Sequence, residues 1–153
     1  MITDDHHDVG NFGQSYIQRS ENNRKSEQRG GKVRGTVMAG KILIVEDNSR
    51  FAEILAILLN EAGYETSLAN NSGQGIGKAL TDRPDLILTD FNLPDMTAIE
   101  AIRILKKIPF TSGIPIVVLT AETARQLKTK ALKAGAADYL ISPTSRIGGV
   151  QRL

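Results

Sequence analysis

Short, continuous apolar runs alternate along this chain with stretches whose apolar residues recur every three or four positions. A run such as Ile42–Val45 is typical of a strand that is buried on both faces. The stretch 51–62 carries one apolar stripe and predicts an amphipathic helix. Strands and helices that alternate through short connections favour a parallel sheet with helices on both faces. The residues of the stripe are Phe51, Ile54, Leu55, Leu58 and Ala62.

The pattern predicts strand and helix four times in succession, followed by a last strand. Thr97 and Glu100 form the T-x-x-E signature of a capping box, which marks the start of the third helix. The expected strands are 42–45, 64–68, 85–89, 116–119 and 139–141. The expected helices start at Asn48 or Ser49, Ser72, Thr97 and Glu122, and they end near Gly63, Leu80, Lys107 and Ala134.

Composition bounds the classes of protein that this chain can belong to. Its 153 residues, 41% of them hydrophobic, suffice for one domain with a core. It has no apolar run long enough to span a bilayer and no secretory signal, and its lack of cysteine fits a reducing compartment. We therefore expect a cytoplasmic protein that does not bind a membrane. The net charge of +2 does not favour nucleic-acid binding.

The first 38 residues are expected to form a disordered extension. Polar residues and glycine dominate there, and no apolar period is present. His6 and His7 can bind a metal, but a solvated tail is the simpler interpretation because nothing would hold these ligands in place. The sequence from Met38 onward resembles a natural start, so residues 1–37 can be an upstream extension with a misassigned start codon.

Carboxylates follow two of the predicted strands at the point where each strand ends. Glu46 and Asp47 follow the first strand, Asp90 follows the third, and the Thr120 hydroxyl ends the fourth. Ligands of open parallel sheets bind at the carboxyl ends of the strands, and in the flavodoxin-like order strands one and three are neighbours. Three carboxylates would then converge, and a hard cation such as Mg²⁺ would relieve their repulsion.

The segments KILIVEDN, DLILTDFNLPDM, IVVLTA and GAADYL resemble the receiver domain of two-component response regulators. The resemblance covers about residues 40 to 143. It implies an α/β fold, a doubly wound five-stranded parallel sheet in the flavodoxin-like order 2-1-3-4-5. The domains would be a disordered extension over 1–38, a receiver over 39–143, and an irregular tail over 144–153.

The resemblance also assigns roles to individual residues of this chain. Asp90 aligns with the phosphoacceptor, which takes a phosphoryl group from a histidine kinase or a phosphotransfer protein. Glu46 and Asp47 align with the acidic pair that binds Mg²⁺ together with Asp90, and Asn92 aligns with the residue that offers a backbone carbonyl to the metal. The residues that align with phosphoryl-contact and switch positions are Thr120, Ala121 and Tyr139.

Each of these residues also has a structural interpretation without chemistry. Thr120 can cap the fourth helix, Tyr139 can be a plain core aromatic, and Glu46 can be a solvated loop acid. The glycines at 73, 75 and 77 follow the second strand and lack the Gly-Lys-Ser/Thr end of a phosphate-binding loop. We expect these glycines to weaken the second helix, by up to about 1 kcal/mol each relative to alanine.

The chain departs from the receiver pattern after its fifth strand. Ser142 occupies the position of a lysine whose charge would contact the phosphoryl oxygens, and Ala98 replaces a usual glycine. The segment after Pro143 contains Gly148 and Gly149 and does not fit an amphipathic fifth helix, so we expect that helix to be missing or degraded. A disrupted reading frame or a truncated gene near residue 142 would account for both Ser142 and the missing helix, and the downstream DNA in the other frames would test this.

Three functions are compatible with these features. The first is a phosphoacceptor receiver that is not an enzyme with a separate substrate and that signals by protein contact, since nothing after residue 143 resembles a DNA-binding helix-turn-helix. The second is a receiver-like interaction module that no longer switches by phosphorylation, as Ser142 suggests. The third is a Mg²⁺-dependent phosphohydrolase of the haloacid-dehalogenase type, which needs Asp-x-Asp on the first strand. This chain instead has Asp90-Phe91-Asn92 on the third.

Overall fold

The computed structural model of the protein describes residues 39–121 and 125–141. The strands are β1 (Lys41–Val45), β2 (Glu65–Ala69), β3 (Leu86–Thr89), β4 (Ile116–Thr120) and β5 (Asp138–Ile141). The helices are α2 (Ser49–Glu61), α3 (Ser72–Asp82), α4 (Ala98–Lys107), the short α5 (Pro109–Ser112) and α6 (Arg125–Ala134). The expected residues 122–124 of the fourth long helix lie outside the described residues, as do the predicted tail, the fifth-helix position and the N-terminal extension.

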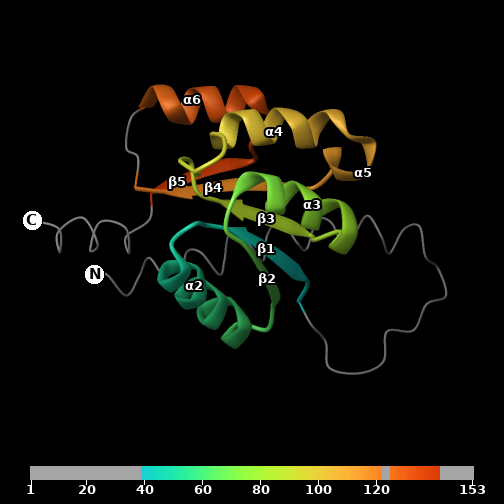
Figure 1. Cartoon of the computed structure of the whole chain (residues 1–153), viewed down its shortest axis with the longest axis vertical. Helices are drawn as coiled ribbons and strands as arrows, with labels where there is room; N and C mark the ends of the chain where they lie inside the picture. Colours follow the sequence, from blue (N-terminus) through green and yellow to red (C-terminus); the bar gives the residue numbers. More distant parts are fainter. Residues whose placement is uncertain (1–38, 122–124, 142–153) are drawn as a thin grey trace, which may run out of the picture.

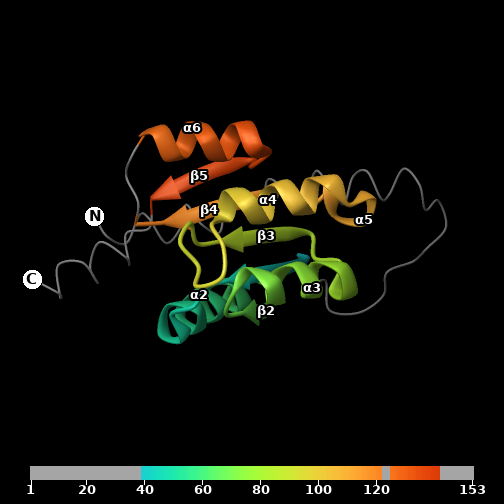
Figure 2. The same cartoon turned by 45° about the horizontal axis from the view of Figure 1, so that its top comes forward.

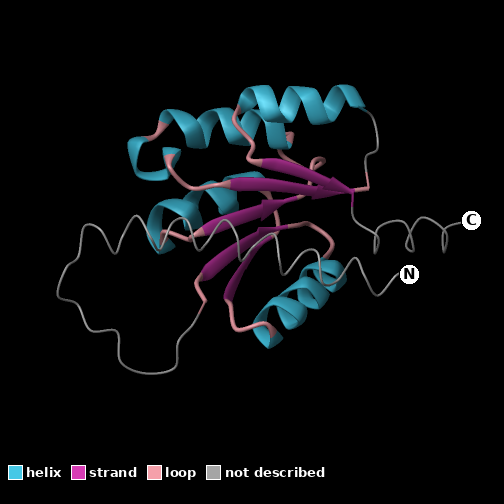
Figure 3. Cartoon of the chain, turned by 180° about the vertical axis from the view of Figure 1, so that it is seen from behind, coloured by secondary structure: helices cyan, strands magenta, loops and turns pink. Residues whose placement is uncertain are grey.

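The five strands form one parallel sheet in the order β2-β1-β3-β4-β5, which confirms the predicted fold and strand order. Figure 1 shows α3, α4 and α6 on one face of this sheet and α2 on the other, and Figure 3 shows the same layers from behind. Apolar side chains fill both interfaces. The cluster on the α3–α4–α6 face includes Leu43, Ile87, Ile102 and Val118, and the cluster on the α2 face includes Ile44, Leu55, Leu59 and Leu88.

The predicted stripe of α2 is wrong in part. Phe51 and Leu55 are buried as expected, but Ile54 is 42% exposed, and Leu59 rather than Leu58 lies in the core. The buried line therefore follows the spacing i, i+4, i+8, with Ala52 beside it. Ile54 and Leu58 are on the flank of the helix, because α2 packs over β1 and β2 at the edge of the sheet and buries a narrower face than its apolar content suggests.

Two other details of the helices differ from the sequence prediction. The side chain of Asn71, not Ser72, caps α3 by accepting a hydrogen bond from the backbone N–H of Gln74 at 2.8 Å. The helix α5 was not predicted; it begins at Pro109, where the missing N–H of proline costs nothing. The capping box of Thr97 and Glu100 is present in α4 as predicted.

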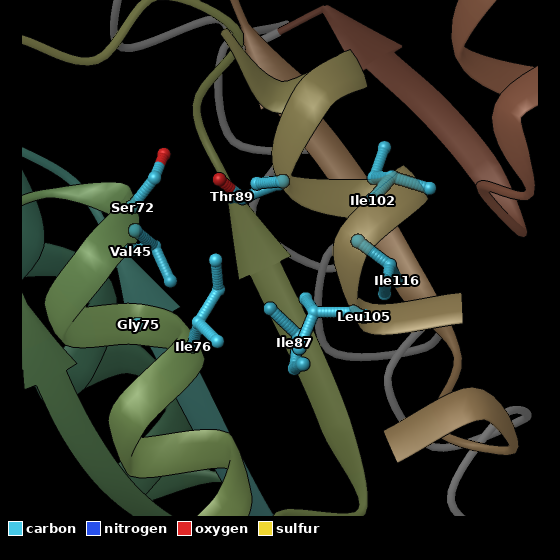
Figure 4. Close-up of a pocket in the computed structure, with 10 residues that line it drawn as sticks. Val45, Ser72, Gly75, Ile76, Ile87, Thr89, Ile102, Leu105 and Ile116 are labelled. Carbon is cyan, nitrogen blue, oxygen red and sulfur yellow. The ribbon is translucent and has the colours of Figure 1, made fainter. Parts of the chain in front are cut away.

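The glycines of α3 have different surroundings, although the sequence treats them alike. A Cβ atom added to Gly75 would lie 2.8 Å from Cγ2 of Val45, whereas one added to Gly77 would meet nothing within 4 Å. Figure 4 shows Gly75 next to Val45 at the edge of a small apolar cavity between α3 and α4. Gly75 therefore permits close packing of α3 on β1, and only Gly77 fits the expectation of a glycine that merely weakens the helix.

No helix in the ranges 39–121 and 125–141 is both long and apolar enough to cross a lipid bilayer.

The different surroundings of Gly75 and Gly77 predict opposite effects on stability when each glycine is replaced by alanine. Gly77→Ala should raise the free energy of unfolding by up to about 1 kcal/mol, because alanine favours the helix and has room there. Gly75→Ala should lower the free energy of unfolding by up to about 2 kcal/mol, because overpacking against Val45 costs about 1–3 kcal/mol and alanine regains only about 1 kcal/mol in helix propensity. Urea denaturation of the two variants beside the parent measures both effects, and a stabilising Gly75→Ala would contradict the assigned packing role.

Candidate functional site

The register between β1 and β3 places the acidic residues side by side. Val45, the last residue of β1, pairs with Thr89, the last residue of β3. The parallel ladder continues one step further, because the N–H of Asp90 donates to the carbonyl oxygen of Val45 at 3.0 Å. Glu46 is held on its other side, where its N–H donates to the carbonyl oxygen of Ala69 at 2.9 Å. The backbone of three neighbouring strands thus positions Glu46 beside Asp90.

The side chains of Glu46, Asp47 and Asp90 converge at this edge of the sheet. Each offers a carboxylate oxygen, and the three oxygens lie within 4.8 Å of one another. Glu46 is buried, Asp90 is partly buried and Asp47 is exposed. Oδ1 of Asp90 also accepts a hydrogen bond from the N–H of Phe91 at 2.8 Å, which fixes the orientation of its carboxylate.

Crowding of these carboxylates changes their protonation. The pKa of Glu46 rises from 4.5 to about 8, first because the carboxyl is buried and then because Asp90 and Asp47 bring negative charge close to it. Burial also raises the pKa of Asp90, although hydrogen bonds from the Thr120 hydroxyl and the Phe91 N–H favour its charged form. Glu46 and Asp90 are hydrogen-bonded to each other. At neutral pH and without a cation, a protonated Glu46 donates to the Asp90 carboxylate.

The donor set fits a hard divalent cation. All three side chains offer oxygen, the ligand atom that Mg²⁺ and Ca²⁺ prefer. In addition, the buried Oε2 atom of Glu46 has no hydrogen-bond partner in the described part of the chain. A buried carboxylate oxygen without a partner is costly, and coordination of a metal would satisfy it. The shared proton and the cation are therefore alternative solutions to the same repulsion.

Of the other predicted site residues around β4 and the β3–α4 loop, Thr120 contacts this cluster directly. Thr120, which ends β4 and is buried, forms a hydrogen bond with Asp90, so the structure brings these two together. Ala121 follows it and is exposed. Asn92 is exposed in the loop between β3 and α4, where it pairs with Thr97 in an isolated bridge.

Tyr139 and Ser142 complete the set of predicted residues. Tyr139 is buried on β5, opposite Val118 of β4, and it belongs to the apolar core on the α3–α4–α6 face. This location agrees with the interpretation of Tyr139 as a core aromatic, and its switch role stays a prediction. Ser142, which stands in the position of the receiver lysine, lies outside the described residues.

Asp95, which lies in the same loop as Asn92, is not among the site residues predicted from the sequence. Its carboxylate accepts hydrogen bonds from the backbone N–H groups of Ser72 and Gly73, at 2.9 and 2.7 Å, at the start of α3. Figure 2 shows the β3–α4 loop reaching the N-terminal end of that helix. The two partners are more than twenty residues apart in the sequence, so no local pattern could have revealed the contact.

Comparison with known proteins identifies one family. Residues 42–152 match the model of the family described as the response regulator receiver domain. Over 117 residues the chain is 42% identical to the phosphate regulon transcriptional regulatory protein PhoB of Pseudomonas aeruginosa, an alignment that covers 76% of this chain and 51% of PhoB. The chain thus spans about half the length of this curated relative.

Solved structures of similar fold include two other response regulators. The chemotaxis response regulator CheY4 of Vibrio cholerae has a TM-score of 0.63 and 30% identity, with 73% of this chain and 96% of that chain covered. A response regulator of Burkholderia pseudomallei was solved with a phosphorylated aspartic acid, a calcium ion and citrate. It has a TM-score of 0.63 and 28% identity, with 67% of this chain and 59% of that chain covered.

The raised pKa of Glu46 predicts a pH dependence of stability in the absence of metal. Between a pH of about 4.5 and about 8, folded Glu46 retains a proton that the unfolded chain has released, so stability should fall as the pH rises through this window. Glu46→Gln removes the titration and should remove this part of the decline. Thermal unfolding of both proteins in a chelator, at several pH values across the window, measures the difference. Parallel curves for the parent and the variant would contradict the assignment.

Proposed function

The chain belongs to the response regulator receiver domain family, and from this premise we propose that Asp90 is the phosphoacceptor of a two-component phosphorelay. In this proposal Asp90 takes the phosphoryl group from a histidine kinase or a phosphotransfer protein in the cytoplasm, and the output is a contact with another protein. The observation that carries the proposal is the convergence of Glu46, Asp47 and Asp90 at the carboxyl ends of β1 and β3. The phosphorylated aspartic acid and the calcium ion of the Burkholderia protein support it.

The proposed chemistry is a transfer between two nucleophiles. A carboxylate oxygen of Asp90 forms a bond to phosphorus while the bond from phosphorus to the donor's nitrogen breaks, and an acyl phosphate results. Asp90 must be charged for this attack, and the hydrogen bonds from Phe91 and Thr120 favour the charged form. The N–H of Phe91 also holds one oxygen in place, which leaves the other to react.

Glu46, Asp47, Asp90 and the backbone carbonyl of Asn92 would hold Mg²⁺. When bound, Mg²⁺ supplies positive charge that offsets the charge on the phosphoryl oxygens and the carboxylates. Glu46 must lose its proton for this role, so binding and deprotonation of Glu46 are coupled. In this proposal the Glu46 carboxyl is protonated without the cation and ionised when the cation is bound.

The remaining residues are proposed to read out the phosphoryl group. The hydroxyl of Thr120 is already hydrogen-bonded to Asp90 and would turn to a phosphoryl oxygen, while the small side chain of Ala121 leaves room for this group. Tyr139 would respond through β5, which pairs with β4 at Val118. Since Tyr139 is fully packed in the core, this response would require a rearrangement of its neighbours.

A second candidate function is a receiver-like module that binds its partner without switching. The observation that favours it is Ser142 in the position of the receiver lysine. A serine hydroxyl can donate a hydrogen bond to a phosphoryl oxygen, but it lacks the charge that makes such contacts about twice as strong. Under this candidate Asp90 could still be phosphorylated, but the modification would have little effect on the rest of the domain.

Phosphorylation itself is tested with a small phosphodonor. Incubation of the protein with acetyl phosphate and Mg²⁺ should add one phosphoryl group to the intact mass, and base should remove it because acyl phosphates are labile. Asp90→Asn should show no adduct, since its amide is not a nucleophile, and a chelator should prevent the adduct in the parent. A folded parent without an adduct would refute the phosphoacceptor and favour the module.

The role of position 142 is tested by restoring the charge. Ser142→Lys should strengthen the effect of phosphorylation on β4 and α6, because a cation near the phosphoryl group stabilises the modified state. Hydrogen exchange of residues 116–121 and 125–134, measured with and without acetyl phosphate, reports this effect. Ser142→Gln serves as a control of similar length without charge. An equal response in the parent and in Ser142→Lys would show that the lysine is dispensable here.

A further inference from the structure

The loop between β3 and α4 is tied to a different helix by a single side chain. Asp95 lies on this loop, and its two carboxylate oxygens accept hydrogen bonds from two successive N–H groups, those of Ser72 and Gly73. These N–H groups belong to the first turn of α3, where they have no partner within the helix. Asp95 therefore supplies acceptors that the helix itself lacks, although 22 residues separate it from Gly73.

Other contacts at this junction support the tie. A Cβ atom at position 73 would lie 3.3 Å from Oδ2 of Asp95, so glycine allows the close approach of the carboxylate. The hydroxyl of the buried Ser72 also faces the loop and lies 3.4 Å from the carbonyl oxygen of Met96. Asn71 caps the N–H of Gln74. The first N–H groups of α3 thus have acceptors both from the residue just before the helix and from the β3–α4 loop.

The same loop carries the groups proposed to act in the site. It begins at Asp90 and includes Asn92, whose backbone carbonyl is a proposed metal ligand. Its first end is fixed by the Asp90 N–H on Val45 and its last end by the capping box of Thr97 and Glu100. Asp95 fixes the middle, three residues after Asn92. Without Asp95, the loop would keep the 3.4 Å contact of the Ser72 hydroxyl with Met96 and the bridge between Asn92 and Thr97, but it would lose both hydrogen bonds from the backbone of α3.

We propose that Asp95 is a positioning residue of the cation site, which holds the Asn92 carbonyl in place by tying the loop to the start of α3. This proposal rests on the proposed function, because it assumes that Asn92 and the three carboxylates bind the cation. Asp95 itself is exposed and does not belong to the Glu46, Asp47 and Asp90 cluster. It acts through the backbone of the loop and not by contact with the phosphoryl group. Residues that support metal ligands typically change metal affinity about tenfold or more when they are removed.

The test compares Asp95→Ala with Asp82→Ala in the full chain. Asp82 is also exposed and is the last residue of α3, whereas Asp95 contacts the start of that helix, so each variant removes one exposed negative charge near one end of α3. The Mg²⁺ concentration that gives half of the maximal phosphorylation rate with acetyl phosphate should rise about tenfold in Asp95→Ala and remain unchanged in Asp82→Ala. The rate at saturating Mg²⁺ should be close to that of the parent in both. Asp95→Asn keeps one acceptor oxygen, so the Mg²⁺ concentration that gives half of its maximal rate should lie between the values for Asp95→Ala and the parent.

A second measurement separates this proposal from the phosphoacceptor role. Hydrogen exchange of residues 91–97 should become faster in Asp95→Ala without Mg²⁺, and Mg²⁺ binding without any phosphodonor should weaken by the same factor. If the parent binds Mg²⁺ but is not phosphorylated, the phosphoacceptor fails while this binding measurement still decides the role of Asp95. Equal Mg²⁺ affinity in the parent and Asp95→Ala would overturn the positioning role. So would a loss of the maximal rate without a change in the Mg²⁺ requirement, and so would a parent that binds no Mg²⁺.

Discussion

The parallel pairing of β1 with β3 is the constraint on which the site depends. Since Val45 lies opposite Thr89, the residues that follow these strands must emerge next to each other. The sequence puts an acid at each of these positions, so the fold forces Glu46 against Asp90. Folding energy from the apolar strands thus holds together charges that would separate in solution. A proton on Glu46 or a bound cation would relieve the repulsion, so protonation of Glu46 and binding of a cation would compete at this site.

The features that the sequence predicted are those that depend on local pattern. Continuous apolar runs identified four of the strands and the weaker pattern of residues 64–68 identified β2, each within one residue at the ends. The T-x-x-E signature identified the start of α4. Each of these signals is contained in a few consecutive residues. The convergence of the carboxylates also followed from a general rule about strand ends. By contrast, the buried side of α2 depends on how the helix lies over β1 and β2. Ile54, which was expected in the core, is therefore exposed, and Leu59, which was not part of the predicted stripe, is buried.

The contacts that the sequence could not predict join segments that are distant along the chain. The close approach of Gly75 to Val45 and the hydrogen bonds of Asp95 to Ser72 and Gly73 depend on how α3 docks on the sheet. Nothing in the pattern of glycines at 73, 75 and 77 distinguishes the three. In the structure, one admits a carboxylate, one admits a strand and one faces open space. The same residue type therefore has three different physical consequences within a single helix.

These tertiary contacts connect the packing of α3 with the chemistry proposed for Asp90. Gly75 lets α3 lie close to β1, and this position brings the first turn of the helix within hydrogen-bond distance of Asp95. A shift of α3 away from the sheet would therefore lengthen the Asp95 contacts and loosen the loop that follows Asp90. Mg²⁺ tolerates little deviation from its preferred octahedral geometry. A loosely held ligand in that loop would consequently weaken binding, even though α3 contributes no atom to the proposed coordination.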